Sequence, residues 1–147
     1  MDRILVAVDG SDHSTKAVAV AAKLTASTGA KLWLLAVIPS AEEVADDLQA
    51  YARTEHVLHD LPQLLASVQP AFLEPAAETA RAEGAATVAI ETASGDPATE
   101  ILARAEEHRA DLIVVGCRGR GRVSGLLLGS VSQKVATHAP CSVLIVR

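Results

Sequence analysis

Glycines, a serine and three arginines near the C-terminal end form the pattern best suited to chemistry. An apolar run leads into Gly116 and Gly119, and Gly129 and Ser130 follow after nine intervening residues. Glycine lets a backbone approach an anion closely and adopt positive φ angles. The residues between add positive charge to a chain of net charge −5, through Arg118, Arg120 and Arg122. The pattern indicates a phosphate-binding loop or, on glycine spacing alone, an ordinary connection between a strand and a helix.

A second polar turn follows the first apolar run of the chain. Residues 4–8 are continuously apolar, and Asp9, Gly10 and Ser11 come directly after them. Asp9 has two interpretations, an acidic group at a ligand site or a residue that only caps the next helix. Ser130 and Ser132 would place two hydroxyls in the first turn of a later helix, whose N–H groups attract anions.

Short apolar runs and helical patterns alternate along the chain. Helices are predicted at 14–28, 42–58, from Pro97 onward and at 130–138. Pro62, Pro70 and Pro75 predict at least one kink or break, or else Pro75 stands at the first position of a helix that runs to Glu83. Strands are predicted at 4–8, 31–38, 87–92, 111–116 and 142–146. The alternation predicts one α/β domain over 1–147, with a mainly parallel sheet and helices on both faces. Ligands of such sheets bind beyond the carboxyl ends of the strands, where strand order reverses.

Composition and missing motifs exclude several function classes. The acidic balance disfavours nucleic-acid binding, and lysines interrupt every long apolar stretch, so no membrane span is expected. Cys117 and Cys141 form no C-x-x-C pair, which favours a reducing cytoplasm. Neither a P-loop nor a G-x-S-x-G motif occurs. His56 and His59 lack a third metal ligand at a useful spacing.

The glycine pattern also resembles that of a known family. Gly116, Gly119, Gly129 and Ser130 reproduce the Gly-x2-Gly-x9-Gly-Ser signature of the ATP-binding branch of the universal stress protein family. The resemblance extends to the segments 4–11, 110–116, 128–132 and 138–141. It implies an open five-stranded parallel sheet of order 3-2-1-4-5, a Rossmann-like, adenine nucleotide α-hydrolase-like topology. It also implies an ATP pocket between the first and fourth strands.

The same resemblance implies a role for each site residue. Asp9 is expected beside the ribose and the metal-bound phosphates, and Val37 beside the adenine. Ala7, Val8, Val115 and Gly116 are expected to line the strand ends. The positions expected to bind phosphate are Arg118, Gly119, Gly129, Ser130, Val131 and Ser132. The implied cofactors are ATP and Mg²⁺, with Asp9 as the metal-binding residue.

The resemblance implies an ATP-binding universal stress protein that acts as a nucleotide-dependent regulator in stress adaptation. Two alternatives remain open, a slow metal-dependent ATPase that uses Asp9 and a dimerisation module with a vestigial nucleotide site. No general base is evident, so any hydrolysis is expected to be slow. The apolar last strand, 142–146, is expected at a sheet edge, where it would pair with a second copy to form a homodimer.

Overall fold

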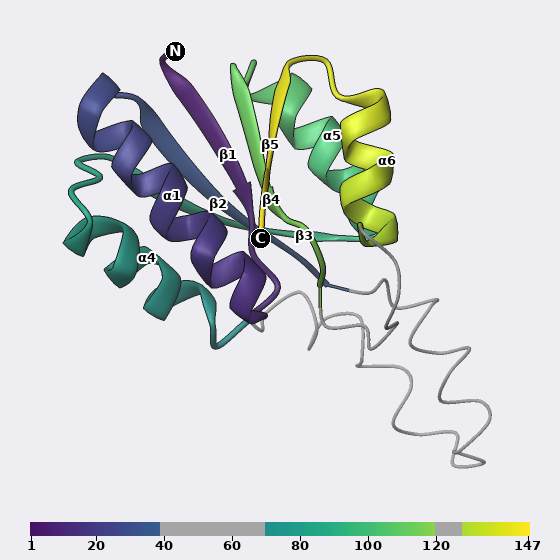
Figure 1. Ribbon diagram of the computed structural model, residues 1–147, viewed down its shortest axis with the longest axis horizontal. Helices are drawn as coiled ribbons and strands as arrows, with labels where there is room; N and C mark the ends of the chain where they lie inside the picture. Colours follow the sequence, from purple (N-terminus) through teal and green to yellow (C-terminus); the bar gives the residue numbers. More distant parts are fainter. Residues whose placement is uncertain (39–69, 120–127) are drawn as a thin grey trace.

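The computed structural model of this protein describes residues 1–38, 70–119 and 128–147. Five strands and four helices alternate in the described ranges (Figure 1). The helix predicted at 42–58, the two histidines His56 and His59, and the arginines Arg120 and Arg122 lie outside these residues. In chain order the elements are β1 (Arg3–Ala7), α1 (Asp12–Thr28), β2 (Lys31–Ile38), α4 (Leu73–Ala82), β3 (Val88–Ser94), α5 (Pro97–Glu107), β4 (Leu112–Gly116), α6 (Ser130–His138) and β5 (Ser142–Val146).

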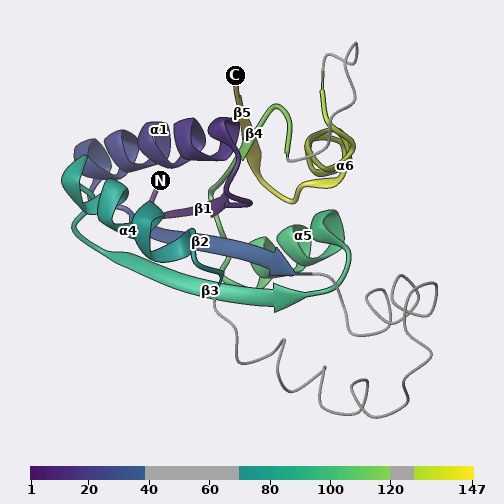
Figure 2. The same ribbon diagram turned by 90° about the horizontal axis from the view of Figure 1, so that it is seen from below.

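The strands form one parallel sheet in the order β3-β2-β1-β4-β5, which confirms the expected topology. The direction of the connections reverses between β1 and β4, so this pair marks the switch point. Figures 1 and 2 show α1 and α4 together on one face of the sheet, and α5 and α6 together on the other.

Side chains of each strand alternate between two apolar cores. Ile4 and Val6 are fully buried against α1 and α4, whereas Leu5 and Ile113 are fully buried on the side of α5 and α6. Alanines of the helices fill much of the remaining space, because small side chains let a helix lie close to a sheet that is covered on both faces.

Local signals explain where the first helix begins and ends. The Ser11 hydroxyl accepts a hydrogen bond from the Ser14 N–H, and Gly29 closes the helix in the left-handed conformation with φ of 72°. The helix therefore begins at Asp12, two residues earlier than the predicted start at Ser14. The predicted end at Thr28 is confirmed.

The placement of Pro75 at the first position of a helix is wrong. Helix α4 begins at Leu73, so Pro75 is its third residue. The physical reason is that none of the first N–H groups of a helix has a partner within the helix, so proline is tolerated through the first turn. The earliest bond within the helix runs from the Ala76 N–H to the Phe72 carbonyl at 3.2 Å.

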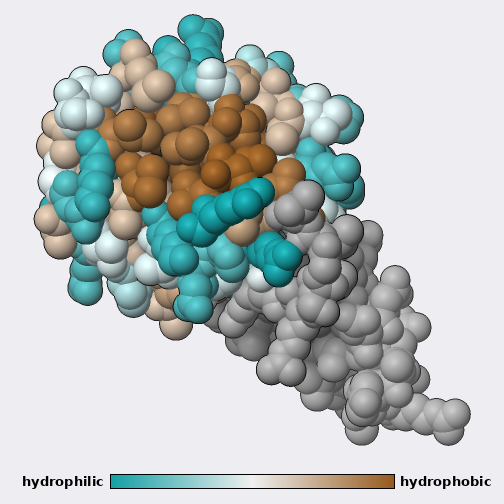
Figure 3. Space-filling model, in the orientation of Figure 1, coloured by the Kyte–Doolittle hydropathy of each residue, from teal (hydrophilic) through white to brown (hydrophobic). Residues whose placement is uncertain are grey.

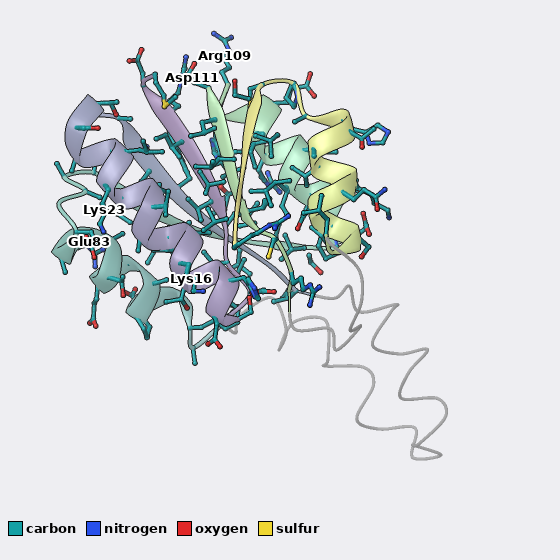
Figure 4. All side chains as sticks on the ribbon, in the orientation of Figure 1. Lys16, Lys23, Glu83, Arg109 and Asp111 are labelled. Atoms are coloured by element: carbon teal, nitrogen blue, oxygen red, sulfur yellow. The ribbon has the colours of Figure 1, made fainter. Side chains whose placement is uncertain are left out.

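Two contacts far from the carboxyl ends of the strands join neighbouring elements of the same layer. Lys23 and Glu83 form an ion pair of 3.7 Å that joins α1 to the end of α4 (Figure 4). The Asp111 carboxylate accepts hydrogen bonds from the backbone N–H groups of Asp2 and Arg3, which fixes the start of β1 and lowers the pKa of Asp111. Among the described helices, none is both long enough and apolar enough to cross a membrane.

Candidate functional site

A pocket of about 370 Å³ opens where β1 and β4 end. This volume is at the lower end of the range typical of small-molecule sites. All twelve site residues expected from the sequence line it, from the first two strands, the end of β4 and the start of α6. They are Ala7, Val8, Asp9, Val37, Val115, Gly116, Arg118, Gly119, Gly129, Ser130, Val131 and Ser132. The tertiary structure therefore brings together segments that lie more than one hundred residues apart in the sequence.

Five further lining residues were missed by the sequence analysis. Two of them, Pro97 and Ile101, come from the first turns of α5 and form part of the apolar wall. The signal that could have found them is topological, because the helix after β3 must begin at the same edge of a parallel sheet as the pocket. The other three are Ser14, Leu35 and Leu128.

The Asp9 carboxylate is held by the turn that follows β1. Its Oδ1 atom accepts hydrogen bonds from the Ser11 N–H at 2.9 Å and from the Ser11 hydroxyl at 2.6 Å. Both interpretations of Asp9 left open by the sequence involve this turn, but the cap of α1 is Ser11 and not Asp9. Asp9 itself lies at the pocket wall.

The signature glycines Gly116, Gly119 and Gly129 do not adopt positive φ, and two of them make room for protein atoms. Among the described glycines, those with positive φ are Gly10, Gly29, Gly84 and Gly95. A Cβ atom at Gly116 would lie 2.8 Å from the Cβ of His13 in α1, and one at Gly119 would lie 2.6 Å from Asp9 Oδ2. One at Gly129 would contact the backbone of residues 117 and 118 at 3.4 Å. The expectation of positive φ is therefore wrong for these three glycines, and close approach explains Gly116 and Gly119.

Hydrogen bonds tie the loop to the start of α6 and to the end of β5. The Gly129 N–H donates to the Cys117 carbonyl at 2.7 Å, and the Cys117 N–H donates to the Val146 carbonyl at 2.6 Å. The buried Ser132 hydroxyl donates to the Gly116 carbonyl at 2.7 Å. This hydroxyl therefore anchors α6 to β4. The backbone N–H of Ser132, in contrast, points toward the pocket at the start of the helix.

Helix α6 begins at the pocket without a capping side chain. Its N-cap is Gly129, and its first turn contains no acidic residue. The other two helices that reach the pocket are capped, α1 by Ser11 and α5 by Asp96. The N–H groups of Ser130, Val131 and Ser132 are thus the open donors at this edge, together with the partial positive charge of a helix N-terminus.

The charges around the pocket are few. Asp9 and Arg118 are the charged residues among the described lining residues. Outside the lining residues, Lys134 of α6 and Asp96, the N-cap of α5, form an ion pair of 3.8 Å, and the hydrogen bonds from Thr99 chiefly lower the pKa of Asp96. No group of three or more His, Cys, Asp or Glu that could hold a metal ion by itself occurs in the described ranges.

The end of β2 presents backbone polar groups to the pocket. The Val8 N–H donates to the Leu35 carbonyl, and the Gly95 N–H donates to the Ile38 carbonyl on the β3 side. Backbone groups at odd-numbered positions of β2 therefore point toward β1, and those at even-numbered positions point toward β3. Pairing between β1 and β2 ends at Leu35. The N–H and C=O of Val37 consequently point toward β1 beyond the end of that pairing, where the pocket lies.

Comparison with known proteins places this arrangement in a family. The sequence profile of the Universal stress protein family matches residues 1–147. The universal stress protein YxiE of Bacillus subtilis (strain 168) is 38% identical over 147 residues, which cover 99% of each chain. The solved structure of the universal stress protein UspA from Lactobacillus plantarum has a TM-score of 0.78 at 26% identity, over 99% of this chain and 97% of that one. A crystal structure of a universal stress protein in complex with cAMP has a TM-score of 0.71 at 29% identity, over 99% and 96%. This chain belongs to the universal stress protein family.

Proposed function

We propose that this protein binds ATP with Mg²⁺ in the pocket between β1 and β4, and that it acts as a nucleotide-dependent regulator in stress adaptation. The observation that carries the proposal is the meeting of all twelve expected site residues around one cavity. A related chain of similar fold holds cAMP in its solved structure, which supports an adenine nucleotide as the class of ligand.

The phosphates are assigned to the side of the pocket formed by α6 and the loop. The uncapped N–H groups at Ser130, Val131 and Ser132 suit an anion, and Arg118 adds a positive charge to the same wall. The helices α1 and α5 offer fewer open donors, because the Ser11 side chain accepts the Ser14 N–H and the Asp96 side chain accepts the Thr99 N–H.

The base is assigned to the opposite, apolar side. Leu35, Val37, Pro97 and Ile101 form a wall that can stack against a flat aromatic ring. The outward-facing N–H and C=O of Val37 supply one donor and one acceptor beside that wall. An adenine edge carries a donor and an acceptor next to each other, so it can bond to both groups.

The residues present fit Mg²⁺ as part of a metal–nucleotide complex. Asp9 is the one carboxylate among the described lining residues, and Mg²⁺ is commonly held by one or two carboxylates together with phosphate oxygens and waters. The ion would neutralise part of the phosphate charge. Because no described cluster can hold the ion alone, binding of Mg²⁺ is expected to require the nucleotide.

Binding without efficient turnover is favoured over an ATPase. Apart from Asp9, no described lining residue has a side chain that could act as a general base. Phosphate release is therefore expected to stay below about one turnover per minute, far under the rates of kinases. Faster turnover that is abolished in Asp9→Asn would support the slow metal-dependent ATPase instead.

Calorimetry tests the assignment of ligand and residues. Nucleotide-free protein is titrated with ATP, AMP and cAMP, each in Mg²⁺ and in EDTA, and ATP in Mg²⁺ is expected to bind most tightly. Arg118→Ala should weaken ATP binding about tenfold, because it removes a charge at the phosphate wall. Arg109→Ala is the matched control, since Arg109 lies near the amino-terminal ends of the strands, whereas the pocket lies at their carboxyl ends (Figure 4). Absence of any heat with ATP in Mg²⁺ would overturn the proposal.

The edge strand β5 is the proposed site of homodimer formation. Val143, Leu144, Ile145 and Val146 are all only half-buried, although they are apolar. Figure 3 shows a continuous hydrophobic area on the face where Figure 1 has β5 between α1 and α6. Antiparallel pairing of two β5 strands about a two-fold axis would cover this area and satisfy the free edge.

The cytoplasm is the proposed location. Cys117 is buried and Cys141 is half-buried, and both are free thiols. Burial is the main factor that raises the pKa of Cys141, which keeps it protonated and less reactive. Two unpaired cysteines suit a reducing compartment.

A further inference from the structure

The two oxygens of the Asp9 carboxylate have different surroundings. Oδ1 accepts two hydrogen bonds from Ser11, from its N–H at 2.9 Å and from its hydroxyl at 2.6 Å. Oδ2 faces the loop after β4, where a Cβ at Gly119 would lie only 2.6 Å away. One oxygen is therefore bound within its own turn, and the other is directed across the pocket wall.

The start of α1 fixes the direction of the Ser11 hydroxyl. This hydroxyl oxygen accepts the Ser14 N–H at 3.2 Å as the N-cap of the helix. A hydroxyl has a single hydrogen, and with the helix N–H on one lone pair, that hydrogen is directed to Asp9 Oδ1. The orientation of the Asp9 carboxylate is thus linked to helix formation rather than left to side-chain rotation.

We propose that Ser11 is a positioning residue that limits Asp9 to one free oxygen, Oδ2, and thereby makes the site select Mg²⁺ over Ca²⁺ in the bound metal–ATP complex. The inference rests on the proposed function of the pocket. Mg²⁺ requires a compact octahedral shell in which a carboxylate contributes one oxygen, whereas Ca²⁺ accepts both oxygens of a carboxylate and a larger shell. Because Oδ1 already accepts two hydrogen bonds, Asp9 cannot bind a metal ion through both carboxylate oxygens.

A purely structural role of Ser11 makes different predictions. As an N-cap alone, Ser11 would affect the stability of α1 and would alter nucleotide binding equally with any metal or with none. As a positioning residue, Ser11 affects only the increase in ATP affinity that the metal ion produces. This increase should change more in Mg²⁺ than in Ca²⁺. Glycine separates the two roles, because it is a tolerated N-cap that lacks the hydroxyl.

The test is calorimetric titration of ATP in EDTA, in Mg²⁺ and in Ca²⁺ for the wild type and four variants. Ser11→Gly should reduce the gain in ATP affinity from Mg²⁺ about tenfold, because one strong hydrogen bond to the carboxylate is lost. Its affinity in EDTA should stay within about twofold of the wild type. The gain from Ca²⁺ should fall less, so that the Mg²⁺ preference shrinks.

Two control variants distinguish the hydroxyl that donates to Asp9 from another hydroxyl of the same turn. Ser11→Thr retains a hydroxyl cap and should keep the Mg²⁺ preference. Thr15→Ala removes a hydroxyl that donates to the Ser11 carbonyl at 3.1 Å rather than to Asp9, and it should bind ATP like the wild type. Ser11→Asp caps the helix with a side chain that has no hydroxyl donor for Asp9, so it should also lose the Mg²⁺ preference, even if Ser11→Gly fails to fold.

Each outcome decides between the claims. Equal losses in EDTA, Mg²⁺ and Ca²⁺, or an unchanged Mg²⁺ preference in both Ser11→Gly and Ser11→Asp, would overturn the role of Ser11 and leave ATP binding intact. A wild type that binds no ATP under any of the three conditions would overturn the proposed function itself, and the role of Ser11 with it.

Discussion

Two glycines at the end of β4 make room for different parts of the protein. Gly116 faces the backbone and Cβ of His13 in the first turn of α1, whereas Gly119 faces the tip of the Asp9 side chain. The neighbour of Gly116 belongs to a packed helix that cannot move without repacking, and the neighbour of Gly119 is a side-chain end that can turn. The same substitution should therefore have different effects at the two positions.

Gly116→Ala should lower the free energy of unfolding by about 1–3 kcal/mol, because the added methyl group forces α1 away from β4. Gly119→Ala should change it by less than about 0.5 kcal/mol, as is usual for exposed positions. In Mg²⁺, however, Gly119→Ala should weaken ATP binding, since it displaces Asp9 Oδ2. Urea denaturation and calorimetry measure the two effects, and equal destabilisation by both variants would contradict this account.

Arg109 is the one non-glycine residue with positive φ in the described ranges. Its φ is 50°, in the turn that joins α5 to β4 (Figure 4). The left-handed conformation costs an ordinary residue about 1–2 kcal/mol. Glycine removes this strain, but its greater conformational entropy in the unfolded chain cancels part of the gain in stability. Arg109→Gly should therefore raise the free energy of unfolding by about 0.5–1 kcal/mol in urea denaturation. Arg109→Ala keeps the strain and serves as the control, so equal stability of the two variants would contradict the prediction.

At the scale of elements, the start of α5 depends on one carboxylate. Asp96 Oδ1 accepts hydrogen bonds from the Thr99 N–H at 3.0 Å and the Thr99 hydroxyl at 2.8 Å. These bonds and Lys134 lower the pKa of Asp96. The element whose first turns form the apolar pocket wall is thus fixed by a cap that titrates.

Asp96→Ala should lower the free energy of unfolding by about 1 kcal/mol at pH 7, and Asp96→Asn by a few tenths, because asparagine still caps. A lowered pKa in the folded state means that the carboxylate stabilises the fold above the ordinary aspartate pKa of about 3.9 and that this contribution is lost as pH falls through the lower folded value. The advantage of the wild type over Asp96→Asn should shrink below about pH 4. Thermal melts across pH 3–7 measure this, and a constant difference would count against the cap carboxylate.

At the scale of the whole molecule, the sheet has two edges that differ in what they expose. β5 is apolar from Val143 to Val146, whereas β3 at the other edge carries Glu91, whose carboxylate is paired with Arg104 and with His108 at the end of α5. Charged and paired side chains discourage the addition of a further strand, and an apolar edge invites it. The asymmetry favours one dimer interface over open-ended assembly.

Leu144→Glu should abolish the dimer, because two carboxylates would meet near the axis of a paired β5. Val88→Glu is the matched control, since Val88 is also half-buried against the same core but lies on β3. Sedimentation equilibrium should show a dimer for the wild type and for Val88→Glu, and a monomer for Leu144→Glu, with thermal melts to confirm folding. A monomeric wild type at micromolar concentration, or a dimeric Leu144→Glu, would refute the interface.

Local sequence signals were sufficient to predict the order of the described elements and several of their bounds. The bounds of β2, α6 and β5 agree with the prediction at both ends, at Lys31–Ile38, Ser130–His138 and Ser142–Val146. Such bounds are set by signals within a few residues, by apolar runs, caps and terminators, so they can be predicted without knowledge of the fold. Right-handed crossovers then restrict the ways in which alternating strands and helices can form a parallel sheet.

The construction of the site, in contrast, depends on contacts between distant segments of the folded chain. Pro97 and Ile101 reach the pocket because α5 packs beside α6, and Gly116 is needed because α1 crosses the end of β4. The difference between the two oxygens of Asp9 likewise depends on a loop more than one hundred residues away. Contacts across the sheet are not encoded by any local pattern, since they depend on which distant backbones approach within a few ångströms.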